Sequence, residues 1–147
     1  LLANKGDIIL VQGYLSNIKP SKGMSNSNLS IVHANFIQRF DKGYTQTINQ
    51  IMCSAQLLSQ PQLMTTQNNK TMAQVNVTIN QQDYSIEKQC WQNHNVEREL
   101  HVWGKQAEYL VEHGKIEGHV MIEGKLSYLA TVDKTQFIEA KNVHLLS

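Results

Sequence analysis

The chain has 147 residues, of which 41% are hydrophobic and 17% charged, and its formal net charge is +1 at pH 7. This composition is typical of a folded protein rather than a disordered one, and the length suits one domain or two small ones. No run approaches the roughly 18 apolar residues that a membrane-spanning helix needs, so we expect a soluble chain with no membrane partner.

The first predicted elements are two strands whose pattern recurs near the end of the chain. The matching segments are DIILVQGYLS (7–16) with GHVMIEGKLS (118–127), and IVHANFIQRF (31–40) with FIEAKNVHLL (137–146). The alignment places Gly13 on Gly124 and Ala34 on Ala140. Because a glycine inside a strand marks a bulge or a sharp bend, each copy is predicted to be a bent strand, a polar connector and a second strand.

This repeat predicts the domain organisation. Nothing before the early copy could supply the other strands of a domain, so residues 1–43 are interpreted as the C-terminal part, strands four and five, of a first domain. Residues 44–147 are interpreted as a complete second domain. Because the sequence starts at Leu1, we expect a fragment, a processed form or the ordered part of a longer chain. Two unrelated hairpins that match by chance are the alternative.

The first half of the second domain contains two predicted strands. Residues 47–60 have strand composition, and Pro61 interrupts them. Residues 72–80 alternate strictly, which predicts a half-buried strand with Ala73, Val75, Val77 and Ile79 on its inner face. Residues 81–95 are polar and irregular, and we predict a long loop there.

The second half contains three predicted strands and one helix. Residues 96–103 alternate, with Leu100 and Val102 on one face and Trp103 on the opposite, polar face. Residues 105–113 form a predicted helix that Gly114 ends, and residues 119–129 and 136–146 are predicted strands. Five short strands with one helix between the third and fourth predict an all-β fold, the five-stranded Greek-key barrel of the oligonucleotide/oligosaccharide-binding (OB) kind, here in tandem with an incomplete first copy.

Two segments of this domain resemble a known family. VWGKQAEYL (102–110) is similar to an aromatic-Gly-Lys-x-Ala-Glu segment, and VMIEGKL (120–126) to a Glu-Gly-x-Leu strand, of the bacterial single-stranded DNA-binding protein family, which includes the primosomal replication protein N branch. The resemblance implies a non-enzymatic binder of single-stranded DNA, or of RNA, that stacks bases on exposed aromatics while Lys and Arg contact phosphates. It implies roles in replication, recombination or repair.

The resemblance also implies which residues bind. Trp103 falls on a family aromatic position and Tyr84 on or next to another, and either Trp91 or Tyr128 is a candidate for a further one. The candidate phosphate contacts are Lys88, Arg98, Lys105 and Lys125. For three of these residues a role without nucleic acid is the alternative: Trp103 could lie in a subunit interface, Arg98 could form a structural ion pair, and Lys105 could be a solvated residue at the start of the helix.

A second hypothesis is a degenerate OB-fold that serves as a protein-interaction or assembly subunit. Glu97 and Thr131 stand where the family carries aromatics, and residues 44–147 have ten acidic residues against eight basic ones. A surface that binds phosphates needs local positive potential, so this balance favours the second hypothesis.

The remaining motifs indicate neither a metal site nor a catalytic nucleophile. The spacing of Cys90 and His94 matches no zinc motif, and no phosphate loop or catalytic motif occurs, so we expect no cofactor, no metal and no enzyme activity. Two cysteines, Cys53 and Cys90, are too few for a disulfide framework, and we expect both to be reduced thiols. By analogy we expect a homo-oligomer, a dimer of tandem barrels, or a subunit of a larger assembly, in a bacterial cytoplasm with the nucleoid or in an organelle.

Overall fold

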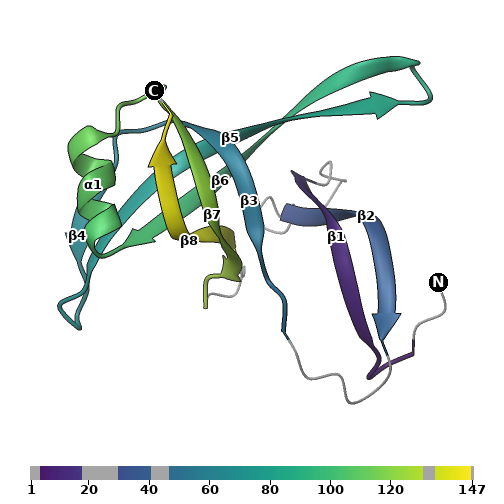
Figure 1. Ribbon diagram of the computed structural model, residues 1–147, viewed down its shortest axis with the longest axis horizontal. Coiled ribbons are helices and arrows are strands. Elements are labelled where there is room, and N and C mark those ends of the chain that lie inside the picture. Colours follow the sequence, from purple (N-terminus) through teal and green to yellow (C-terminus); the bar gives the residue numbers. More distant parts are fainter. Residues whose placement is uncertain (1–3, 18–29, 41–46, 131–134, 147) are drawn as a thin grey trace, which may run out of the picture. The chain divides into compact units, whose positions relative to one another are not determined.

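The structure, a computed structural model, describes residues 4–17, 30–40, 47–130 and 135–146. It divides into two compact units, Leu1–Asn49 and Gln50–Ser147, each with its own hydrogen-bonded sheet (Figure 1). Two positions that the sequence analysis names lie outside the described residues. They are the predicted domain boundary between residues 43 and 44, and Thr131, which stands where the family carries an aromatic residue.

The first unit contains one antiparallel pair of strands, β1 (Ile8–Asn17) and β2 (Ser30–Phe40). The register of this pair shifts between Gln12 and Gly13, which is a bulge at the predicted glycine. A Cβ atom on Gly13 would lie 1.8 Å from the backbone oxygen of His33, so the approach of the two strands at this point requires glycine.

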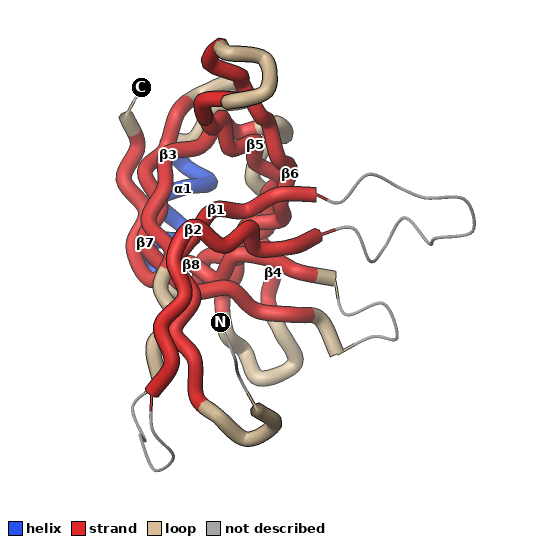
Figure 2. The backbone as a smooth tube through the Cα atoms, turned by 90° about the vertical axis from the view of Figure 1, so that its right-hand side faces the viewer, coloured by secondary structure: helices blue, strands red, loops and turns tan. Residues whose placement is uncertain are grey.

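The second unit is a closed barrel. Its strands are β3 (Ile51–Leu57), β4 (Gln62–Thr65), β5 (Thr71–Ser85), β6 (Cys90–Trp103), β7 (His119–Tyr128) and β8 (Gln136–Leu145). The strand order is β3-β7-β8-β6-β5-β4, and β3 also pairs with β5, which closes the ring. All pairs are antiparallel except β6 with β8. The ring and its single helix confirm the predicted OB-fold, and Figure 2 shows how strands dominate the described chain.

Alternation along the strands builds the core of the barrel. In β5 the inward residues are Ala73, Val75, Val77 and Ile79, all buried as predicted. Inward residues of the other strands meet them, and the largest fully buried side chains include Leu57, Leu100, Ile122 and Ile138. Because the residues between these inward positions point to the outside, each strand presents a second, outer face.

The helix α1 (Lys105–His113) has the predicted bounds and packs against β4, β5, β6 and β8. Its inward side chains Ala107 and Leu110 are fully buried. Gly114 ends the helix, and its N–H donates to the backbone oxygen of Leu110 at 2.7 Å. A Cβ on Gly114 would lie 2.4 Å from that oxygen, so glycine permits the chain to leave the helix here. No helix in the described ranges is long and apolar enough to cross a membrane.

The β7–β8 pair repeats the bulge of β1–β2. The register shifts between Glu123 and Gly124, and Gly124 faces Ala140 just as Gly13 faces Ala34. A Cβ on Gly124 would lie 2.2 Å from the backbone oxygen of Glu139. The glycine and alanine matches in the sequence therefore correspond to the same local geometry in two hairpins.

The prediction of a long loop at residues 81–95 is wrong. Strands β5 and β6 continue through this stretch as a two-stranded ribbon that projects beyond the barrel, and only residues 86–89 form a turn (Figure 1). The pairing is continuous from Met72 with Trp103 to Ser85 with Cys90. The sequence here lacks apolar alternation because a ribbon beyond the barrel has no core to cover, and the cross-strand ladder of hydrogen bonds holds its two strands together.

The structure also refines the first predicted strand. Strand β3 covers only the middle of residues 47–60, and the chain beyond Pro61 forms the additional short strand β4, which pairs with β5. Proline cannot donate a hydrogen bond to a ladder, so it separates the two strands.

Candidate nucleic-acid interface

The outer side of the β5–β6 pair carries three of the eight predicted binding residues, Tyr84, Trp91 and Trp103. Its cross-strand pairs run from Met72 with Trp103 at the barrel to Tyr84 with Trp91 near the tip of the ribbon. Between these two ends lie five more pairs on the same face, which we call the outer ladder: Gln74 with His101, Asn76 with Glu99, Thr78 with Glu97, Asn80 with Asn95, and Gln82 with Asn93. At about 3.3 Å per residue, the twelve steps from Trp103 back to Trp91 span about 40 Å.

Trp103 lies at the end of β6 on the outer face of the barrel, with 37% of its surface exposed. Its neighbours across the sheet are Met72 and, beyond it, Met64. The following Gly104 has φ +70°, a conformation that favours glycine, and its N–H donates to the backbone oxygen of Thr71 at 2.9 Å. This turn starts the helix directly after Trp103, and the indole stays partly exposed on the outer face of the barrel.

Tyr84 and Trp91 form a second aromatic site near the tip of the ribbon. Their ring centroids lie 5.6 Å apart with an interplanar angle of 69°. Half of Tyr84 and 70% of Trp91 are exposed. The adjoining turn is closed by a hydrogen bond from the Lys88 N–H to the Ser85 hydroxyl at 3.2 Å. Residues that the sequence separates by seven positions are thus direct neighbours, and the turn that follows Tyr84 carries the exposed Lys88.

The predicted lysines occupy three different places. Lys88 is exposed in the turn at the ribbon tip, and Lys105 is exposed at the start of α1, two residues after Trp103. Lys125 lies on the outer face of β7, where its Nζ is 3.7 Å from Glu139 Oε2 in a solvent-exposed ion pair. Lys70, which the sequence analysis did not single out, adjoins the strand position that bonds to Gly104. Lys70 and Lys105 therefore flank the Trp103 end of the outer ladder.

Arg98 points into the barrel and is only 5% exposed. Its Nε donates to Gln136 Oε1 at 2.9 Å and its Nη1 donates to the backbone oxygen of Glu97 at 2.8 Å. Burial lowers the pKa of Arg98 from its ordinary value, while the neighbouring Tyr128 acts in the opposite direction. A guanidinium held this way supports the strand from inside the barrel through hydrogen bonds to an amide and to a backbone oxygen.

Tyr128 ends β7 and is more than half exposed. Its hydroxyl accepts a hydrogen bond from Gln136 Nε2 at 3.0 Å. Gln136 thus links Tyr128 to Arg98, so this part of the barrel is tied together by polar contacts. The exposed ring of Tyr128 remains available as a surface aromatic on a strand that does not adjoin β5.

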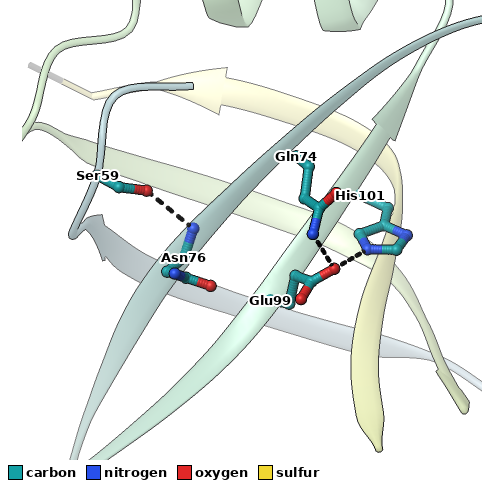
Figure 3. A network of polar contacts seen from close by, with 5 residues as sticks. All are labelled: Ser59, Gln74, Asn76, Glu99 and His101. Carbon is teal, nitrogen blue, oxygen red and sulfur yellow. Dashed lines mark hydrogen bonds and ion pairs between the residues drawn. The ribbon is translucent and has the colours of Figure 1, made fainter. Parts of the chain in front are cut away.

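A polar network occupies the barrel end of the outer ladder (Figure 3). The carboxylate of Glu99 lies between Gln74 and His101 and accepts from both. The His101 Nε2 is 2.5 Å from Glu99 Oε1, and because a carboxylate only accepts, His101 donates through this nitrogen. The imidazole also stacks on Phe137, with ring centroids 4.2 Å apart. Nearby, the backbone N–H of Asn76 donates to the Ser59 hydroxyl at 3.3 Å. The two bonds of Glu99 hold the side chains of Gln74 and His101 in place near the Trp103 end of the ladder.

Within the described ranges, no group of three or more His, Cys, Asp or Glu side chains is arranged to hold a metal ion. Cys53 and Cys90 are free thiols. Cys53 faces the barrel interior, and burial raises its pKa to about 11. The features that sequence reasoning missed are Lys70 and the run of neutral amides on the outer ladder. The high Asn and Gln content was the available signal, but the pairing register was needed to place these residues together.

Comparison with known proteins decides the family. The family model described as the single-strand binding protein family matches residues 48–145. The chain belongs to this family. The matched range coincides with the barrel unit. A search of curated protein sequences gave no match.

Several solved structures share the fold. The wild-type single-stranded DNA-binding protein of Thermus aquaticus has a TM-score of 0.78 at 20% identity, over 99% of this chain and 62% of that one. The Plasmodium falciparum protein, solved in complex with single-stranded DNA, has a TM-score of 0.58 at 13% identity, over 69% and 97% of the two chains. The PriB protein of Ralstonia solanacearum has a TM-score of 0.55 at 17% identity, over 69% and 100%. The present chain spans 51% and 62% of the two Thermus aquaticus chains that it matches.

Proposed function

We propose that the chain binds single-stranded DNA without catalysis and acts in DNA replication, recombination or repair. The observation that carries the proposal is the exposed indole of Trp103 on the outer wall of a closed barrel, in a chain of the single-strand binding protein family. Stacking of a base on such a ring contributes about 1 to 3 kcal/mol whatever the base is. The exposed Tyr84 and Trp91 offer a second stacking site on the same face.

The test is a titration of intrinsic tryptophan fluorescence with oligo-dT at 50 and 200 mM salt. Stacking of bases on the two tryptophans quenches their emission, so we expect saturable quenching in both conditions. A double-stranded oligonucleotide is the control, because its bases are already stacked and it should compete poorly. An oligo-U arm shows whether RNA is bound as well. Absence of quenching and of binding at both salt concentrations would refute the proposal.

The alternative is an assembly subunit that has lost strong binding to nucleic acid. Its support is the acidic balance of residues 44–147, ten acidic residues against eight basic ones. Isolation of the protein with its partners separates the two functions. A protein complex that survives nuclease and high salt favours the assembly role, whereas a complex that nuclease dissolves favours the binding role.

We infer further that β1 and β2 are strands four and five of a first OB-fold, in tandem with the barrel. The support is the shared bulge at Gly13 and Gly124. A second support is that Ile9 and Val11 are exposed, while the residues aligned with them, Val120 and Ile122, are fully buried in the barrel. Such an apolar face is typical of a hairpin that packs against further strands.

The tandem inference can be tested by substituting Val11 with Asp in the natural full-length polypeptide. If three further strands cover this face, the buried charge lowers the melting temperature markedly. An unchanged melting temperature would show that the face is open to solvent. Two barrels per chain would let a dimer present four binding surfaces, and sedimentation velocity measures that assembly directly. The proposed location is the nucleoid-associated cytoplasm of a bacterium, or an organelle.

A further inference from the structure

The outer ladder is unusual in its charge. Six of its ten side chains are neutral amides, namely Gln74, Asn76, Asn80, Gln82, Asn93 and Asn95. The others are Thr78, His101 and two carboxylates, Glu97 and Glu99, so none of the ten is Lys or Arg. The lysines near the ladder, Lys70, Lys88 and Lys105, all lie at its ends. The face between the two aromatic sites is therefore neutral to acidic.

This distribution restricts how a single strand can lie on the ladder. A phosphate placed against Glu97, which is exposed, would face a like charge and gain no opposite one. A base edge placed there meets amides instead. An amide carries two donors and an acceptor, so it can pair with the donors and acceptors of any base. The favourable orientation thus turns bases toward the ladder and phosphates toward solvent.

The amides near the ribbon are available for such contacts. Asn80, Asn95, Gln82 and Asn93 are exposed and form two successive cross-strand pairs. Facing pairs on one side of an antiparallel ribbon lie within hydrogen-bonding reach of a common ligand. At the barrel end the situation differs, because Gln74 is already bonded to Glu99.

We propose that the outer ladder is a base-contacting surface, and that, among the described residues of the barrel unit, the phosphates of a strand bound there contact Lys70 and Lys105 at one end and Lys88 at the other. This inference rests on the proposed function and specifies its mode. Each phosphate that is neutralised on a single strand contributes about −0.7 to the slope of log K against log salt concentration. Three lysines predict a slope of about −2, which is about a 20-fold loss of affinity between 50 and 200 mM salt.

The experiment measures dissociation constants of oligo-dT at four salt concentrations for three proteins. These are the wild type, the double variant Asn80→Ala with Asn95→Ala, and a matched control with Gln81→Ala and Gln92→Ala on the opposite face of the same ribbon. We expect the Asn80 and Asn95 variant to bind about 10-fold more weakly with an unchanged salt slope, because it loses neutral hydrogen bonds only. The control should bind within about twofold of the wild type.

A fourth protein, Lys105→Ala, should flatten the salt slope by about 0.7. A wild-type loss above about 100-fold across the salt range, or unchanged affinity in the Asn80 and Asn95 variant, would overturn the inference while leaving the binding function intact. Failure of the wild type to bind oligo-dT at all would instead refute the proposed function. Circular dichroism checks that the ribbon variants keep the fold.

Discussion

Substitution of Trp103 with Ala tests the stacking site most directly. The substitution removes the indole that a base would stack on, which predicts a loss of binding free energy of about 1 to 3 kcal/mol. This corresponds to a dissociation constant about 5- to 150-fold higher. Replacement with Phe keeps an aromatic face at the same place, so Trp103→Phe should recover most of the affinity.

The same substitution also affects folding, and the structure gives the size of that effect. Trp103 is 37% exposed, so a little under two thirds of a side chain of about 200 Å² is covered. At about 25 cal/mol per Å², this covered area corresponds to about 3 kcal/mol, an upper bound because unfolded chains also bury some surface. The unfolding free energy of the Ala variant must therefore be measured by urea titration before its binding is interpreted.

The binding assay is fluorescence anisotropy of labelled oligo-dT, at a temperature where circular dichroism shows both variants fully folded. Substitution of Tyr109, an exposed aromatic on α1, with Ala is a matched control that should leave binding unchanged. A folded Trp103→Ala variant that binds within twofold of the wild type would refute the stacking role. The indole would then be an interface residue, and the oligomeric state of the variant would change instead.

Packing and burial lead to four further predictions. At pH 8 the exposed Cys90 should react with iodoacetamide, whereas Cys53 should react only on unfolding. The reason is that the pKa of Cys53, about 11, lowers its thiolate fraction about 100-fold below that of an ordinary thiol with pKa 9.0. Mass spectrometry of the alkylated chain counts the modified sites. The same shift predicts that Cys53 adds no pH dependence to the free energy of unfolding below about pH 9. Between about pH 9 and 11 it lowers that free energy, because the folded state holds the thiol proton more tightly; urea titrations across this range test it, and a flat profile there would contradict it. Substitution of Gly124 with Ala should lower the melting temperature by about 10 °C or more, since the new Cβ would lie 2.2 Å from the backbone oxygen of Glu139. An unchanged calorimetric melting temperature would show that the two strands can move apart at the bulge with no loss of stability. Substitution of Gln136 with Ala removes the acceptor for the buried Arg98 and should cost about 1 to 3 kcal/mol of stability in urea; a smaller cost would mean that water replaces the amide.

The sequence predicted the barrel well because apolar alternation records which side of a strand faces the core. Strand β5 and the helix α1 follow this rule, and the repeat of Gly13 and Gly124 correctly indicated a bulge in each copy. The projecting ribbon escaped prediction for the same reason, since a ribbon without a core shows no alternation. The conformation of this ribbon depends on the pairing of β5 with β6, which the pattern of a single strand does not indicate.

The candidate site was only partly predictable. The alternation of residues 96–103 places Trp103 on the outer face, and the structure finds it exposed there. Tyr84 and Trp91 were identified separately, but their contact depends on the cross-strand register, which one sequence does not specify. Arg98 shares a strand face with Leu100. How deeply that face is buried depends on the closure of the barrel, which the sequence alone does not show.

The ring of strands is joined unevenly around its circumference. Strands β5 and β6 share fourteen facing pairs, whereas β3 and β5 share only two, Gln56 with Thr78 and Leu57 with Val77, supplemented by a hydrogen bond from the Leu58 N–H to the Asn76 oxygen at 2.8 Å. Separation at this short junction would turn the cylinder into a curved open sheet without breaking any bond of the ribbon. Transient opening of the molecule should therefore begin at β3, and the surface proposed to hold DNA belongs to the half that stays assembled.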